Sequence, residues 1–123
     1  AAGGPQKGGP ARAAAARAEL QEALRLLGGA EQEAQGTCCR TLLRVLENAL
    51  REPCEPKFRQ LSRANKALAA KVFAVAGAEE VLRAAGWQPG PETVVLPADA
   101  PTAGLELVAA GLRGRLAELE RAA

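Results

Sequence analysis

The chain has 123 residues and carries 16 Lys and Arg against 14 Asp and Glu, which gives a net charge of +2. This length suits one domain with a single modest core and excludes two. The sequence has neither an apolar stretch of membrane-spanning length nor the pattern of a secretory signal. We therefore expect no membrane partner and a cytoplasmic location, with the nucleus as an alternative.

The N-terminal part predicts a linker followed by a helix. Residues 1–10 are rich in Gly and Pro and do not begin with Met, so we expect a flexible linker in a piece of a longer protein. Residues 11–28 use strong helix formers, with Leu20, Leu24 and Leu27 at helical spacing before two glycines. This segment predicts an N-terminal helix that ends at the glycine pair.

A second helix is predicted over residues 32–51. Its apolar positions recur every three or four residues along one face, and prolines follow its end. Val45 and Asn48 lie beside this apolar stripe. They belong to a flank that can face a partner.

The rest of the chain predicts shorter helices around one hairpin. We expect a turn at 58–61, helices at 65–73 and 78–85, and a last helix at 102–121. β-branched residues at 93–96, after a Pro-Gly-Pro turn, predict a small antiparallel hairpin. The expected fold class is α+β, a mostly helical single domain with a small antiparallel β-sheet. We assign five side chains to its core: Phe58, Leu61, Phe73, Leu82 and Trp87.

Side-chain chemistry argues against catalysis and against a metal site. The chain has no His and no Tyr, and Ser62 is its single serine, so a Ser or Cys nucleophile lacks its usual base. Cys38, Cys39 and Cys54 have neither the spacing of a zinc site nor the even count of a disulfide framework. We expect free thiols, no metal, no cofactor and no enzymatic activity in this domain.

A basic run gives the strongest indication of a partner. Between Lys57 and Lys71 the sequence contains Lys and Arg but no Asp or Glu. In a chain with so small a net charge, this imbalance indicates an anionic ligand. A nucleic acid is one such ligand, but the mild overall basicity and the single aromatic residue of the run, Phe58, disfavour it.

The same region resembles a known domain family. The motifs that carry the resemblance are LENALREP at 46–53, KFR at 57–59, RANKAL at 63–68, VAGA at 75–78, Leu82, AGW at 85–87 and VVLP at 94–97. In their order and gaps the chain resembles the PUB (or PUG) domain over about residues 36–121. That domain occurs in peptide:N-glycanase, in some UBX-domain cofactors and in the linear-ubiquitin ligase subunit. The resemblance implies helices around a small antiparallel sheet.

The resemblance also implies a peptide-binding domain, which we place at 32–122. PUB domains bind short acidic segments in which an aromatic residue precedes Gly. The best known is the C-terminal tail of the valosin-containing AAA ATPase, and deubiquitinases and their adaptors supply others. We therefore expect ubiquitin-system partners and a link to ER-associated degradation. Carried over to this chain, the binding residues are Val45, Asn48, Lys57, Arg59, Arg63, Asn65, Lys66 and Leu68.

These residues have three implied roles. The two asparagines would hydrogen-bond the peptide backbone or its terminus, the four cations would meet acidic side chains, and Val45 with Leu68 would line an apolar slot for the aromatic ring. Several family members place an aromatic residue at the position of Val45, and Phe or Val at the position of Leu68. The slot therefore loses ring stacking, worth about 1 kcal/mol.

Two structural alternatives stay open. Asn65 can act as a helix cap and Asn48 can bond locally, so neither asparagine needs a ligand to explain it. The helix at 11–28 can pair with a partner helix, which would make the chain an assembly scaffold.

Overall fold

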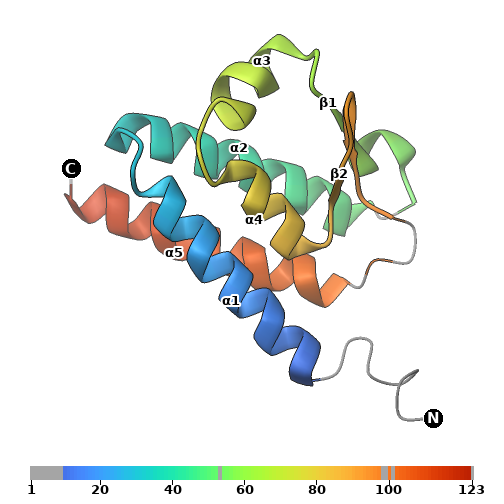
Figure 1. Ribbon diagram of the computed structural model, residues 1–123, viewed down its shortest axis with the longest axis horizontal. Helices are drawn as coiled ribbons and strands as arrows, with labels where there is room; N and C mark the ends of the chain where they lie inside the picture. The colour runs from blue at the N-terminus through green and yellow to red at the C-terminus, as the bar shows by residue number, and fades with distance from the viewer. Residues whose placement is uncertain (1–9, 53, 98–99, 101, 123) are drawn as a thin grey trace.

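The computed structural model describes residues 10–52, 54–97, 100 and 102–122 (Figure 1). Apart from Pro10, the linker predicted for residues 1–10 lies outside this part of the chain. The helices are α1 (Pro10–Leu27), α2 (Gln32–Arg51), α3 (Lys66–Leu68), α4 (Ala78–Ala85) and α5 (Thr102–Ala122), with a 3-10 turn η2 (Pro56–Arg59) and a π-helical turn η3 (Ala69–Phe73). The strands are β1 (Gln60–Ser62), β2 (Gln88–Pro89) and β3 (Thr93–Val95).

This architecture confirms the predicted α+β class, a mostly helical domain with a small antiparallel sheet. The sheet has the order β1-β3-β2, with Leu61 opposite Val94 and Gln88 opposite Val95. The sequence predicted the hairpin but a turn at 58–61, where the structure has η2 and β1. Three residues carry too little periodicity to predict a strand, and β1 forms because it pairs with a distant segment.

The segment predicted as one helix at 65–73 is a single α-turn followed by a π-helical turn. Asn65 Oδ1 caps α3 by accepting a hydrogen bond from the Leu68 amide at 3.1 Å. The Ala74 amide then donates to the Ala69 carbonyl at 2.9 Å, which is the i to i+5 pattern of a π-turn. The wider turn ends at Phe73, and Gly77, the residue before α4, has a φ of 91° in the left-handed region.

The core is largely aliphatic and is formed by buried residues of α1, α2, α4, α5 and the sheet. Leu42, Leu82 and Val108 are fully buried, and Trp87 is buried beside them. Of the five side chains assigned to the core, Leu61, Leu82 and Trp87 are buried, Phe73 is half-buried against the core, and Phe58 is half-buried. Phe58 lies in the short η2 turn, where the ammonium group of Lys57 is 5.5 Å from its ring centroid.

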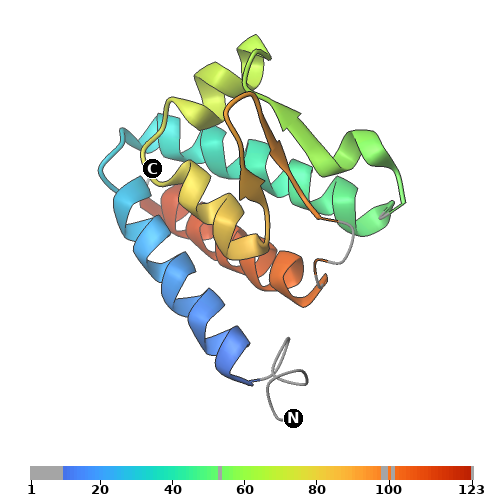
Figure 2. The same ribbon diagram turned by 45° about the vertical axis from the view of Figure 1, so that its right-hand side comes forward.

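Helix α1 packs against α4 and α5, on the side of the molecule opposite α3 in both views (Figures 1 and 2). Leu20, Ala23 and Leu27 are buried there. A Cβ on Gly77 would lie 2.5 Å from the Ala23 carbonyl oxygen, and one on Gly111 would lie 2.7 Å from a methyl carbon of Leu20. Glycine at these two positions permits the close approach of α1.

Two side chains fix the C-terminal end of α1. Gln35 is buried, and its Nε2 donates to the Ala30 carbonyl at 2.7 Å in the turn after α1. Arg115 Nη2 donates to the Leu24 carbonyl at 3.1 Å, where a cation also complements the negative end of the helix dipole. The partner-helix alternative requires the apolar face of α1, and α4 and α5 already cover that face.

Within the described ranges, no helix combines the length and the hydropathy that a membrane span requires.

Candidate functional site

The α2 part of the predicted site holds an apolar side chain and an asparagine. Val45 is half-buried and packs against the core. Asn48, one turn further, is also half-buried, and its Oδ1 accepts a hydrogen bond from Arg51 Nη2 at 2.8 Å. Nδ2 of Asn48 has no hydrogen-bond partner in the part of the chain that the structure describes. Asn48 therefore presents a free amide donor.

The α3 part of the predicted site also combines an asparagine with an apolar side chain. Asn65 is exposed, and its Oδ1 is occupied by the capping bond to the Leu68 amide. Its Nδ2 has no partner among the described residues. The side chain of Leu68 is half-buried against the core, and Lys66 is exposed. Helix α2 packs against η3, which begins at the residue after Leu68, and both Val45 and Leu68 pack against the same core.

Arg63 makes several contacts within the fold. Its Nε donates to the Gly90 carbonyl at 2.7 Å, and its Nη1 lies 2.7 Å from Glu79 Oε1. Its guanidinium carbon lies 5.2 Å from the centroid of the Phe73 ring. The Arg63 amide also donates to the Glu92 carbonyl at 3.0 Å. Arg63 thus joins the loop after β1 to the hairpin turn and to α4.

Lys57 and Arg59 flank Phe58 on η2. Lys57 is exposed and lies over the Phe58 ring. Arg59 is half-buried, and its Nη2 donates to the Pro97 carbonyl. The Arg59 carbonyl accepts from the Leu96 amide at 2.7 Å. These bonds tie η2 to the chain that follows β3, so Arg59 supports the sheet as well as contributing charge.

The fold changes the charge pattern that the sequence indicated. The basic run contains no acid, but Glu79 of α4 comes from outside it and pairs with Arg63. Lys66 and Lys71 are exposed and form no ion pair with any described residue. Uncompensated charge of the run therefore lies on Lys66, beside Asn65, and on Lys71 of η3.

Sequence reasoning missed Arg51. This residue is exposed at the end of α2 and fixes the amide orientation of Asn48 through the bond to Oδ1. The signal was available, because Arg51 follows Asn48 by three residues and side chains at that spacing share a helix face.

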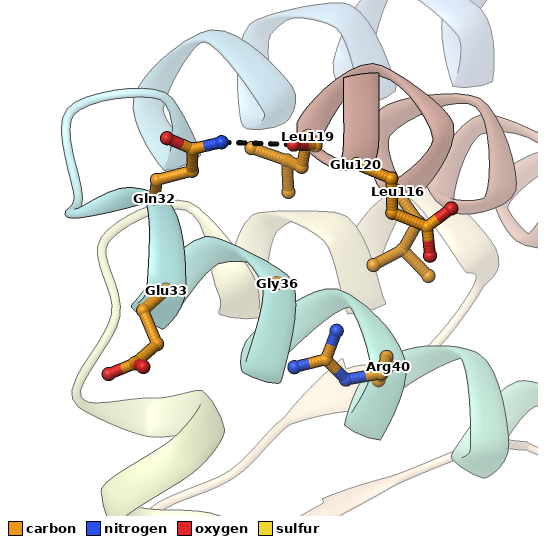
Figure 3. Close-up of a pocket in the computed structure, with 7 residues that line it drawn as sticks. All are labelled: Gln32, Glu33, Gly36, Arg40, Leu116, Leu119 and Glu120. Atoms are coloured by element: carbon orange, nitrogen blue, oxygen red, sulfur yellow. Dashed lines mark hydrogen bonds between the residues drawn. The ribbon is translucent and has the colours of Figure 1, made fainter. Parts of the chain in front are cut away.

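A surface hollow of about 370 Å³ lies elsewhere, between the start of α2 and the end of α5 (Figure 3). Leu116 and Leu119 give it an apolar side, Gln32 bonds to the Leu119 carbonyl at 2.9 Å, and Arg40 lies across from them. The predicted binding residues do not line it. The hollow is therefore separate from the candidate site, whose residues lie further along α2, on η2, and from Arg63 to Leu68.

The buried cysteines do not provide a nucleophile. Burial raises the pKa of the Cys38 thiol to about 12, and the neighbouring Cys39 adds to the effect. Burial also raises the pKa of Cys39 to about 11, against the opposing influence of Arg115 and Arg40. Both thiols are protonated at neutral pH. Among the residues with described positions, no group of three His, Cys, Asp or Glu side chains could hold a metal ion.

Comparison with known families identifies the domain that holds the candidate site. Residues 32–109 match the family model described as the PUB domain. The match runs from the first residue of α2 into α5, so it contains all of the candidate site and leaves α1 outside. The comparison with curated proteins found no match.

Proposed function

The chain belongs to the PUB family of protein–protein interaction domains in the ubiquitin and protein-degradation system, and we propose that it docks short acidic peptides on α2 and α3. The PUB domain is a binding domain and not a catalytic one. The best candidate ligand is the C-terminal tail of the valosin-containing AAA ATPase. A deubiquitinase or adaptor segment of the same chemistry is the competitor.

The observation that carries this proposal is the state of the two asparagines. In both Asn48 and Asn65 the amide oxygen already accepts a bond within the fold, from Arg51 Nη2 and from the Leu68 amide. Each side chain is left with an Nδ2 donor that forms no bond within the described residues and is available to an acceptor from a ligand. Main-chain carbonyls and a terminal carboxylate are the acceptors that a peptide offers.

An apolar contact and positive charge complete the proposed site. Val45 and Leu68 are half-buried, so part of each side chain stays available to an anchor residue of the peptide. Lys66 and Lys71 are exposed and uncompensated among the described residues. Exposed charges of this kind raise the rate of association with an acidic peptide more than they raise its final affinity.

Calorimetry with an acidic peptide ending in aromatic-Gly tests the proposal. Asn65→Ser keeps an oxygen that can cap α3 but removes the Nδ2 donor. We expect it to raise the Kd about fivefold, the cost of one hydrogen bond of about 1 kcal/mol. Gln21→Ala, an exposed amide on α1, is the control and should leave the Kd unchanged.

Two results would count against the proposal. If the wild-type domain does not bind the peptide, the ligand class is wrong. If wild type and Asn65→Ser bind equally, the peptide docks elsewhere. An amidated peptide separates the two acceptors, because a large loss of affinity on amidation identifies the terminal carboxylate as the contact.

A further inference from the structure

Asn48 lies between two arginines on the surface of α2. Arg44 precedes it by four residues and Arg51 follows it by three, and all three side chains therefore share one side of the helix. Both arginines are exposed. A ligand that reaches the Asn48 amide meets guanidinium groups before and after it along the helix.

Only one acid lies within this part of α2, and it is directed elsewhere. Glu47 follows Arg44 by three residues, a spacing at which helical ion pairs form. Its carboxylate instead lies 3.1 Å from Arg113 Nη2 on α5. Arg51 Nη2 donates a hydrogen bond to Asn48 Oδ1. Arg44 has no hydrogen bond or ion pair with any residue that the structure describes.

The neighbouring arginine on the same stripe behaves differently. The guanidinium of Arg40 lies toward Gly36, with Nη1 3.4 Å from the position that a Cβ on Gly36 would take (Figure 3). Arg40 thus turns to the hollow near the start of α2, away from Asn48. Arg44 is the uncompensated cation next to the free donor of Asn48.

We propose that Arg44 is a specificity-determining residue that binds an acidic side chain of the docked peptide, next to the main-chain group held by Asn48. This inference rests on the proposed function. It adds a cation on α2 to the positive charge of the basic run, which lies on η2, α3 and η3. The preferred peptide then needs two acidic positions, one for Arg44 and one for Lys66 and Lys71.

A charge-swap experiment tests this assignment after wild-type binding has been measured. Arg44→Glu should raise the Kd of the acidic peptide about tenfold, because it removes one attraction and adds a repulsion. Arg17→Glu makes the same charge change on an exposed residue of α1 and should change the Kd less than twofold. Arg44→Gln, which only removes the charge, should give an intermediate value.

The acids of the peptide are then replaced by Lys one at a time. One such peptide should bind Arg44→Glu at least as tightly as it binds wild type, which identifies the acid that faces Arg44. If Arg44→Glu and Arg17→Glu weaken binding equally, or if no swapped peptide restores binding, the Arg44 assignment is wrong and the proposed function stands. No binding by wild type overturns both.

Discussion

Arg63 and Glu79 form an ion pair at 2.7 Å across the α3 side of the domain, between the loop after β1 and the first turn of α4. The same guanidinium bonds the Gly90 carbonyl at 2.7 Å and stacks on Phe73. Arg63, which the sequence predicts to bind a ligand, is thus a structural connector within the fold. It holds the loop that positions Asn65.

Arg63→Ala should therefore destabilise the domain. The change removes a hydrogen bond to the Gly90 carbonyl, an ion pair and a ring contact. Because the side chain of Arg63 is 29% exposed and that of Glu79 is 39% exposed, water screens the ion pair, and we expect a loss of about 1–2 kcal/mol in the free energy of unfolding. Urea unfolding measures it.

Arg83→Ala is the matched control for this prediction. Arg83 is exposed on α4 and has no hydrogen bond or ion pair with any described residue, so its loss should cost less than about 0.5 kcal/mol. Equal stability of the Arg63 and Arg83 variants would contradict the connector role. Glu79→Gln should fall between them, because it keeps an oxygen for Arg63 but loses the charge.

The thiols should divide into one reactive and two protected groups. Cys54 is exposed, whereas Cys38 and Cys39 are buried with pKa values raised to about 12 and about 11. A maleimide should label Cys54 rapidly in the native state and label the other two only after unfolding. Mass spectrometry counts the adducts. Fast labelling of three thiols in the native protein would show that the α2 core opens readily.

The same burial predicts a fall in stability at high pH. The folded state keeps the Cys38 and Cys39 thiols protonated up to about 12 and about 11, whereas the unfolded thiols lose their protons near 9.0. Between these values the unfolded chain binds fewer protons than the folded one, so the free energy of unfolding falls as pH rises. Cys38→Ala should reduce the slope of this fall in urea melts from pH 8.5 to 10.5.

Helix α1 should be required for stability although it lies outside the family match. Leu27 is fully buried, so Leu27→Ala should cost about 2–4 kcal/mol. Leu26 is half-buried and gives a control with the same chemical change and a smaller loss. Gly77→Ala should also destabilise the domain, because its φ is 91° and a Cβ would meet the Ala23 carbonyl.

Thermal unfolding measures these variants, and sedimentation then tests the scaffold alternative. If α1 served to pair with a partner helix, Leu27→Ala would weaken association and leave the melting temperature unchanged. We expect the reverse, since the apolar face of α1 is buried on α4 and α5 within one chain.

The limits of the sequence predictions follow from the range of the interactions. Periodicity over many residues placed α2 at the bounds that the structure shows, Gln32–Arg51. Strand β1 was not predicted because its three residues are ordered by pairing with β3. The Arg63–Glu79 pair joins positions 16 residues apart, and no local pattern marks it. The sequence also did not predict that Asn48 would offer its Nδ2 as a donor. That orientation results from the bond between Arg51 Nη2 and Asn48 Oδ1, and Arg51 is not among the predicted site residues.

Arg51 gives the last prediction, which concerns orientation rather than charge. Its Nη2 holds the Asn48 oxygen at 2.8 Å and so leaves Nδ2 as the group available to a peptide carbonyl. Arg51→Ala frees the amide to rotate, so the donor must be ordered on binding. The affinity for the acidic peptide should fall about two- to fivefold, the cost of fixing one side-chain rotamer at about 0.5–1 kcal/mol.

Arg51→Lys keeps the positive charge but lacks the planar guanidinium fork, and therefore separates orientation from electrostatics. If Arg51→Lys binds as tightly as wild type while Arg51→Ala binds weakly at low salt and normally at high salt, Arg51 acts through its charge alone and does not orient Asn48.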